Sequence, residues 1–214
     1  MRRLLFAGLP FLAFAHDPIT TKLTWSAEVS RILQNRCMGC HQDGGRAPFP
    51  LTTYAQARPW AVAIRDEVAR RTMPPWGAVR GFGEFQNDPS LAPEEIERIV
   101  DWVNGGAPEG DPQLAPAGRP KPFADLQPHG RSVAVSGSYT FSAPARLVAL
   151  RPTGPLQAVL RRVDGSIEPL LWMDQHKPGW RHAFVLREPF EVQRGDRVEF
   201  MPLSPAARLI VILQ

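Results

Sequence analysis

The chain has 214 residues, of which 43% are hydrophobic and 21% charged; this is ordinary usage for one or two globular domains and excludes a chain that is disordered throughout. Its formal net charge is only +4 and its Lys and Arg residues are dispersed, so a nucleic-acid partner is not expected. Proline is frequent, with 23 residues, and favours short elements joined by long connections.

The first 15 residues have the pattern of a secretory signal peptide. Arg2 and Arg3 give a positive start, residues 4–12 are apolar, and residues 13–15 read Ala-Phe-Ala, a typical cleavage site. The apolar run is too short to span a membrane, so no transmembrane segment is expected after signal removal. A buried strand or an uncleaved anchor is the alternative. The pattern predicts a periplasmic or secreted protein.

Three amphipathic helices are expected after the signal peptide. The first follows Thr24 and the second follows Thr53, because threonine is a favourable N-cap residue. The third begins at Pro93, has acidic residues in its first turn, and ends at the Asn-Gly-Gly of residues 104–106. These patterns predict an all-α domain over residues 16–106.

Short strands replace the helical pattern in the second half of the chain. Residues 107–130 hold six prolines and predict an extended, semi-rigid linker. The later strands are separated by turns such as Asp164-Gly165 and predict a β-sandwich over residues 131–214. The fold class expected for the chain is therefore α + β, with two domains. The strands are expected at residues 133–141, 146–150, 156–162, 167–172, 182–187, 197–201 and 209–213.

Residues 37–41 read Cys-Met-Gly-Cys-His, which is the C-x-x-C-H attachment signature of c-type haem. Cys37 and Cys40, at this spacing near a helix end, can each reach one haem vinyl group, and His41 then becomes the proximal iron ligand. The alternatives are a thioredoxin-like redox pair, which needs a βαβ context, a zinc site, which needs two further ligands, and a structural disulfide. Export and the helical surroundings favour one covalent haem c.

Met73 is the expected sixth ligand of the haem iron. It lies within residues 72–76, Thr-Met-Pro-Pro-Trp, where two prolines stiffen the chain. Met38 lies between the attaching cysteines and cannot reach the other haem face, whereas Met173 and Met201 belong to the strand region. The alternative is that Met73 only packs in the core. Ligation by histidine and methionine predicts electron transfer rather than catalysis at the iron.

Residues 24–112 resemble a class I cytochrome c domain, and more closely a bacterial subfamily that combines C-x-x-C-H with A-P-F-P-L, M-P-P-W and E-E-I-x-x-I-x-x-W-V. The resemblance implies an all-α cytochrome c domain with His41 and Met73 as axial ligands. It also implies that a proline carbonyl, near Pro48 or Pro50, accepts the Nδ1 hydrogen of His41, and that a redox partner protein exists. The motifs stand at residues 37–41, 47–51, 73–76 and 94–103.

Residues 163–200 resemble, more weakly, the C-terminal sandwich of copper type II ascorbate-dependent monooxygenases. That family binds copper with an H-x-H pair and a later methionine, and residues 150–154, where the pair is expected, contain no histidine. His176, His182 and Met201 remain as candidate ligands. We therefore expect a sandwich without copper that docks or positions a partner. The alternative is a two-domain oxidoreductase in which the haem feeds a copper site.

A binding module is a third interpretation of the sandwich. Exposed Trp172 or Trp180 would favour a domain that binds carbohydrate or protein. Buried tryptophans at these positions would instead indicate core packing. The overall expectation is an electron carrier rather than an enzyme.

Overall fold

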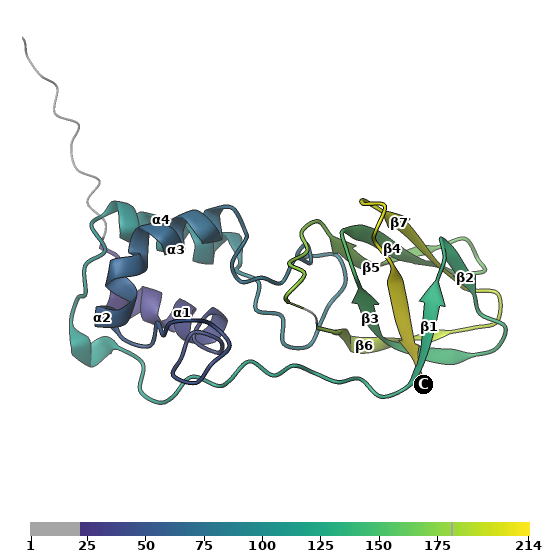
Figure 1. The fold of residues 1–214 in the computed structure, drawn as a ribbon, viewed down its shortest axis with the longest axis horizontal. Coiled ribbons are helices and arrows are strands. Elements are labelled where there is room, and N and C mark those ends of the chain that lie inside the picture. The colour runs from purple at the N-terminus through teal and green to yellow at the C-terminus, as the bar shows by residue number, and fades with distance from the viewer. Residues whose placement is uncertain (1–21, 181) are drawn as a thin grey trace, which may run out of the picture.

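The computed structural model describes residues 22–180 and 182–214. A helical unit and a β unit lie one after the other along the long axis of the molecule (Figure 1). The expected signal peptide, residues 1–15, lies outside the described residues. Among the residues that are described, none of the helices combines the length and the apolar character needed to cross a membrane.

Short helices form the N-terminal unit. Thr24 and Thr53 both act as caps, since each hydroxyl accepts a backbone N–H of the following turn, at 3.2 and 3.3 Å. The second expected helix is divided into three pieces around Pro59, which has no N–H to donate. The elements are the π-helical turn η1 (Trp25–Val29), α1 (Ser30–Arg36), α2 (Tyr54–Ala57), the 3-10 turn η2 (Arg58–Trp60), α3 (Ala61–Ala69), α4 (Pro93–Asn104) and the 3-10 turn η3 (Pro112–Leu114).

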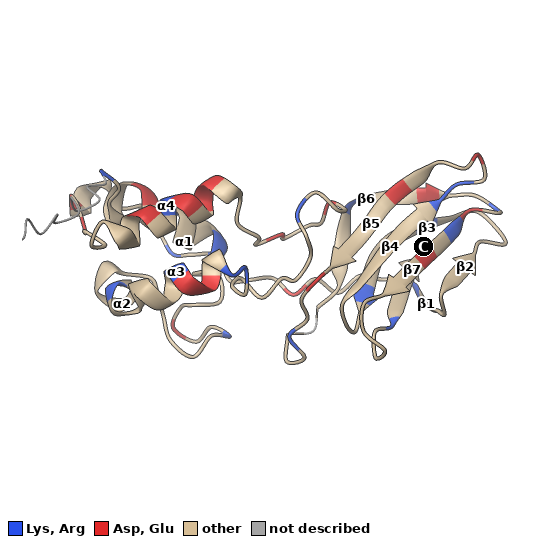
Figure 2. Cartoon of the chain, turned by 90° about the horizontal axis from the view of Figure 1, so that it is seen from above, with Lys and Arg blue, Asp and Glu red and all other residues tan. Residues whose placement is uncertain are grey.

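The start of α4 is joined to the end of α1 by charged side chains. The carboxylate of Glu95 accepts the N–H of Ala92 at 2.7 Å, so it caps its own helix. The same carboxylate pairs with the guanidinium of Arg36 at 3.1 Å. Asp and Glu residues lie along α3 and α4 of the helical unit, as the colouring of Figure 2 shows. The ion pair between Arg36 and Glu95 therefore links α4 to the end of α1, which leads directly into the C-x-x-C-H motif.

The prediction of an all-α cytochrome c domain over residues 16–106 is wrong. The longest helix has 12 residues, and residues 70–92, between α3 and α4, run as turns and extended chain. This stretch is rich in residues that stop helices, including Pro74, Pro75 and three glycines with positive φ. The chain is a mixed structure of short helices, long irregular segments and two antiparallel sheets.

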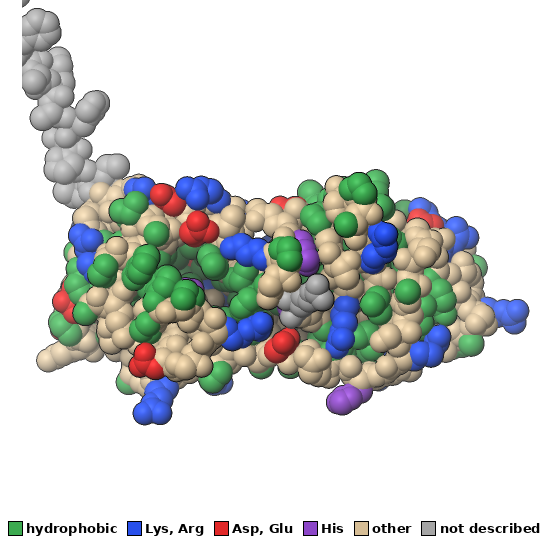
Figure 3. Space-filling model, viewed as in Figure 1, with side chains coloured by type: hydrophobic (Ala, Val, Ile, Leu, Met, Phe, Trp, Pro, Cys, Tyr) green, Lys and Arg blue, Asp and Glu red, His purple; other side chains and the backbone are tan. Residues whose placement is uncertain are grey.

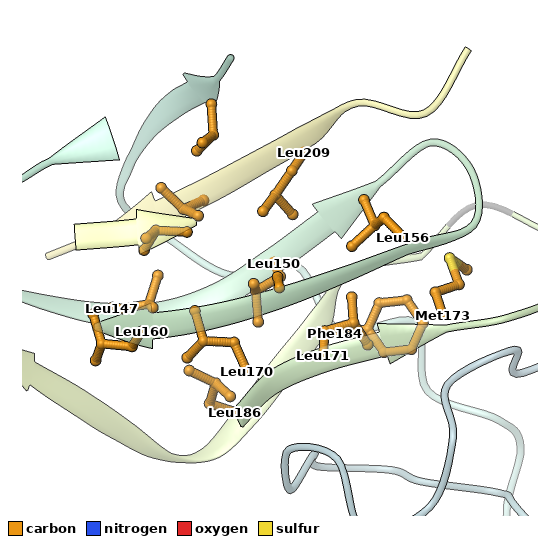
Figure 4. Close-up of a cluster of buried hydrophobic side chains, with 14 of the residues drawn as sticks. Leu147, Leu150, Leu156, Leu160, Leu170, Leu171, Met173, Phe184, Leu186 and Leu209 are labelled. Atoms are coloured by element: carbon orange, nitrogen blue, oxygen red, sulfur yellow. The ribbon is translucent and has the colours of Figure 1, made fainter. Parts of the chain in front are cut away.

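Two four-stranded antiparallel sheets form the β unit, with the orders β1-β8-β3-β6 and β2-β7-β4-β5. Alternate residues of β4, Leu156, Ala158 and Leu160, are buried, as expected for a strand with one face in a core. Figure 4 shows leucines of both sheets meeting in one cluster. The strands are β1 (Arg131–Val135), β2 (Ser138–Thr140), β3 (Ala145–Pro152), β4 (Leu156–Arg161), β5 (Ile167–Met173), β6 (Phe184–Val192), β7 (Arg197–Pro202) and β8 (Leu209–Leu213).

The strand expected over residues 133–141 is in fact two strands, β1 and β2. Gly137 lies between them with a φ of 72°, in the left-handed region that favours glycine. The chain turns there and passes from one sheet to the other. The sequence predicted a single strand because apolar residues continue to alternate across Gly137, whereas the turn depends on the backbone conformation of the glycine.

Residues 76–86, here called the crossing segment, leave the helical unit and complete the sandwich. The N–H of Val79 donates to a carbonyl of β5 at 2.7 Å, and the N–H of Gln86 to a carbonyl of β6 at 2.8 Å. Because β5 and β6 are the edge strands of the two sheets, the segment covers both edges on the same side. Trp76 and Phe85, each only 3% exposed, belong to the sandwich core.

The proline-rich residues 107–130 run between the two units (Figure 1). The N–H of Phe123 donates to the carbonyl of Gly39, within the C-x-x-C-H motif, at 2.9 Å. The ring of Phe123 packs against the sandwich core. The side-chain amide of Asn87 donates to the carbonyl of Ala124 at 2.7 Å. The linker therefore contacts both units along its second half.

Replacement of Phe85 by alanine is expected to lower the free energy of unfolding by about 3–5 kcal/mol, because it removes a buried aromatic side chain from the sandwich core. Chemical denaturation followed by tryptophan fluorescence measures this change. Leu203→Ala, at a side chain that is 50% exposed, is the control and is expected to change stability by about 0.5 kcal/mol or less. Equal, small effects of both substitutions would contradict the burial of Phe85.

Candidate functional site

A cavity of about 710 Å³ lies where α1, α3, the linker and the sandwich meet. Its volume is within the range of about 300–1,000 Å³ that small-molecule and cofactor sites occupy. Cys37, Cys40 and His41 line it from the turn after α1, and Met73 lines it from the turn after α3. Figure 3 shows hydrophobic side chains gathered around a hollow in the helical half, with Lys and Arg toward the sandwich. The structure thus brings the four predicted site residues to one cavity.

The C-x-x-C-H motif continues α1 as a tight turn. The N–H groups of Cys40 and His41 both donate to the carbonyl of Cys37, at 3.1 and 2.9 Å. Gly39 lies where the linker passes closest, and a Cβ atom at this position would come within 3.0 Å of the carbonyl oxygen of Lys121. The small residue inside the motif therefore allows the linker to pack on it.

His41 is oriented by a backbone carbonyl. Its Nδ1 lies 3.1 Å from the carbonyl oxygen of Phe49, which accepts the hydrogen and leaves Nε2 as the lone-pair donor. The expected acceptor, a carbonyl of Pro48 or Pro50, is corrected: the acceptor belongs to the residue between them. The N–H of Leu51 donates to the carbonyl of His41 at 2.9 Å, and this bond holds the loop so that Phe49 faces the ring.

Burial perturbs the titratable groups of the motif. It lowers the pKa of His41, an effect that the hydrogen bond to Phe49 partly opposes, so the imidazole is neutral at neutral pH. Burial, helped by the neighbouring Cys40, raises the pKa of Cys37 to about 12. Burial also raises the pKa of Cys40, and Arg46 opposes this. Both thiols are free in the described structure and protonated at neutral pH.

Met73 is positioned by the end of α3. Its N–H donates to the carbonyl oxygen of Glu67, with an N–O distance of 3.4 Å, in the turn that ends the helix. Of the methionines that the structure describes, Met73 is the one that lines the cavity. Met38 is buried in the helical core and Met173 in the sandwich core, whereas the side chain of Met201 is 58% exposed.

The sandwich forms part of the cavity wall, which the sequence did not indicate. Lys177, Gly179 and Trp180, in the loop between β5 and β6, line the cavity. The guanidinium of Arg46 lies 4.1 Å from the centre of a Trp180 ring, a cation–π contact between the two units. The indole Nε1 of Trp180 is buried and lacks a hydrogen-bond partner among the described residues. Trp172 and Trp180 are both half-buried, so neither is an exposed binding platform.

The expectation of a metal-binding protein needs one correction. The described residues offer no site for a metal ion that protein side chains alone would hold. Within residues 22–180 and 182–214, His, Cys, Asp and Glu form no group of three or more that could hold one. His182 stacks on Trp76, with ring centres 4.6 Å apart. It therefore packs against the sandwich core, whereas Met201 lies on the outer surface of its sheet.

Comparisons of the chain with protein-family models, with curated proteins and with solved structures gave no match. The resemblance to c-type cytochromes therefore depends on the four motifs at residues 37–41, 47–51, 73–76 and 94–103. Three of these, excluding the last, contribute lining residues to the cavity.

In protein produced without haem, Cys37 is expected to react with iodoacetamide at least about tenfold more slowly than Cys40, because a thiol with a pKa of about 12 holds very little thiolate at neutral or mildly alkaline pH. Mass spectrometry of the labelled peptides measures the two rates. In denaturant the two rates should become equal, which provides the control. Equal rates in the folded protein would contradict the burial of the Cys37 thiol.

The stability of the protein is expected to fall as the pH is lowered from 6.5 to about 4. Burial lowers the pKa of His182 to about 4, with Asp125 opposing this and Arg46 and His176 reinforcing it. In that range the unfolded chain binds a proton that the folded chain does not, so acid favours unfolding by up to roughly 3 kcal/mol.

His182→Phe keeps an aromatic ring against Trp76 and should remove this part of the pH dependence. Urea denaturation of both proteins at about pH 7 and about pH 4.5 measures it, and subtraction removes the contribution of His41, whose pKa is also lowered. The same pH dependence in both proteins would show that His182 is not buried in its neutral form.

Proposed function

We propose that the chain is an exported, mono-haem c-type electron carrier. In this proposal, Cys37 and Cys40 attach the haem covalently, and His41 and Met73 are its axial iron ligands. The observation that carries the proposal is that these four residues, from two separate turns, line one cavity of about 710 Å³. Export and a periplasmic or secreted location rest on the pattern of residues 1–15.

The residues that line the cavity fit a covalent haem. Two free thiols stand at the attachment spacing, and the Nε2 atom of His41 carries a lone pair because Nδ1 donates to Phe49. Cations suit the anionic propionates of haem, and Arg46, Lys121 and Lys177 line the same cavity. The unpartnered indole N–H of Trp180 is a further donor beside them.

Each residue then has a defined role in electron transfer. The bound haem supplies a one-electron iron couple. Hydrogen bonding to Phe49 increases the basicity of His41 and holds its ring orientation. The Met73 thioether would raise the reduction potential, and the apolar side chains that line the cavity would limit access of water. Because the protein supplies both axial ligands, the proposed role is to pass electrons to and from a redox partner protein.

Protein expressed with the c-type maturation machinery is expected to contain one haem per chain that stays bound after denaturation. Acidified organic solvent should fail to extract it, and the pyridine haemochrome spectrum should be of the c type, because Cys37 and Cys40 would each form a thioether bond. The Cys37→Ser, Cys40→Ser double variant is the control and should lose its haem on extraction. Extraction of haem from the wild-type protein would refute the proposal.

A further inference from the structure

The turn that carries Met73 is held by a different unit on each side. On the helical side, the N–H and the hydroxyl of Thr72 both donate to the carbonyl of Glu67, each at 3.0 Å. On the other side, Trp76 is buried in the core of the sandwich. Met73 lies between these attachments and is joined to Trp76 by two prolines. Its position therefore depends on both units.

The link between Met73 and Trp76 is short and stiff. A proline ring fixes its own φ and restricts the residue before it, so Pro74 and Pro75 remove most of the backbone freedom between the two side chains. The N–H of Trp76 donates to the carbonyl of Pro74 at 2.8 Å, which closes the turn. A displacement of the indole is therefore transmitted to Met73.

The indole of Trp76 is fixed by aromatic neighbours from the sandwich and the crossing segment. It stacks on His182, with ring centres 4.6 Å apart and planes inclined by 13°. Phe184, in β6, lies 4.7 Å from it, and Phe85 makes an edge contact at 6.2 Å. Aromatic contacts of this kind hold a side chain in one orientation.

Backbone contacts extend the attachment beyond Trp76. The N–H of Asp174 donates to the carbonyl of Gly77 at 3.2 Å, and the N–H of Arg187 donates to the carbonyl of Glu84 at 2.8 Å. A Cβ atom on Gly77 would lie 2.1 Å from the carbonyl oxygen of Gln175, so the two backbones are in direct contact there. The crossing segment is thus bound to the sandwich along its length.

We infer that Trp76 is a positioning residue for Met73, and that the β-sandwich is the scaffold that holds the sixth iron ligand. The inference rests on the proposed function, because it concerns the ligand set of the haem. A neutral thioether is a weak ligand, and holding it in place beforehand lowers the entropic cost of ligation. When the anchor is lost, Met73 is free to leave the iron and the reduction potential falls.

Substitutions of Trp76 in the full-length, haem-containing protein test this inference. Trp76→Leu removes the surface that stacks on His182, whereas Trp76→Phe keeps an aromatic ring there. The measurements are the near-red ferric band of methionine-ligated haem and the reduction potential. Met73→Ala defines complete loss of the ligand. Phe141→Leu is the matched control, because Phe141 is buried in the same core but packs against Tyr139.

Trp76→Leu is expected to lose the band and to shift the potential down to the value of Met73→Ala, and Trp76→Phe is expected to restore both. Phe141→Leu should lower stability while leaving band and potential unchanged. Phe85→Leu weakens the packing around Trp76 and should give a partial loss of the band and a smaller fall in potential. This variant tests the positioning role if Trp76→Leu does not fold.

Pyridine haemochrome analysis of every variant separates the two ways of failing. Haem that extracts from the wild-type protein would overturn the proposed function. If the haem is covalent but the Trp76 and Phe85 variants leave the band and the potential unchanged, the positioning role is overturned and the proposed function is not. Covalent haem without the band in the wild-type protein would also overturn it, since Met73 would then not be the ligand.

Discussion

Burial of Trp76 and Phe85 in the sandwich core is the interaction on which the rest of the structure depends. The edge strands β5 and β6 would otherwise present unpaired backbone groups on one side of the molecule. The crossing segment satisfies several of these groups and fills the core with its two aromatic side chains. The segment begins three residues after Met73. The packing that completes the β core therefore also positions Met73 in the wall of the cavity.

The same packing sets the chemistry of the cavity. The apolar enclosure raises the pKa of Cys37 and lowers the pKa of His41, since a low-polarity surrounding disfavours the charged form of each group. Both are therefore neutral before any ligand is bound. Arg46, Lys121 and Lys177 are cationic lining groups that suit an anionic part of a ligand, whereas Arg36, which also lines the cavity, is paired with Glu95. Under the proposed function, the sandwich is part of the haem pocket as well as a separate β structure.

Local features of the fold were predictable because short stretches of chain decide them. The N-caps Thr24 and Thr53 and the bounds of α4, Pro93–Asn104, follow from side-chain hydrogen bonds and backbone preferences within one turn. Strands such as β4 follow from alternation over six residues. The all-α prediction was wrong because it classed residues 16–106 by their three helices alone, whereas the prolines and glycines of residues 70–92 leave a long irregular segment between α3 and α4.

By itself, the sequence located the C-x-x-C-H motif and predicted Met73 as the sixth ligand, because the spacing of the cysteines and the small number of methionines limit the candidates. Only the tertiary structure decided that the carbonyl of Phe49 orients His41, and that Trp180 meets Arg46 across the two units. It also decided that the crossing segment joins the sandwich. That segment has neither a helical nor an alternating apolar pattern, so its conformation depends on which strand edges are free to pair, and this is a property of the folded chain.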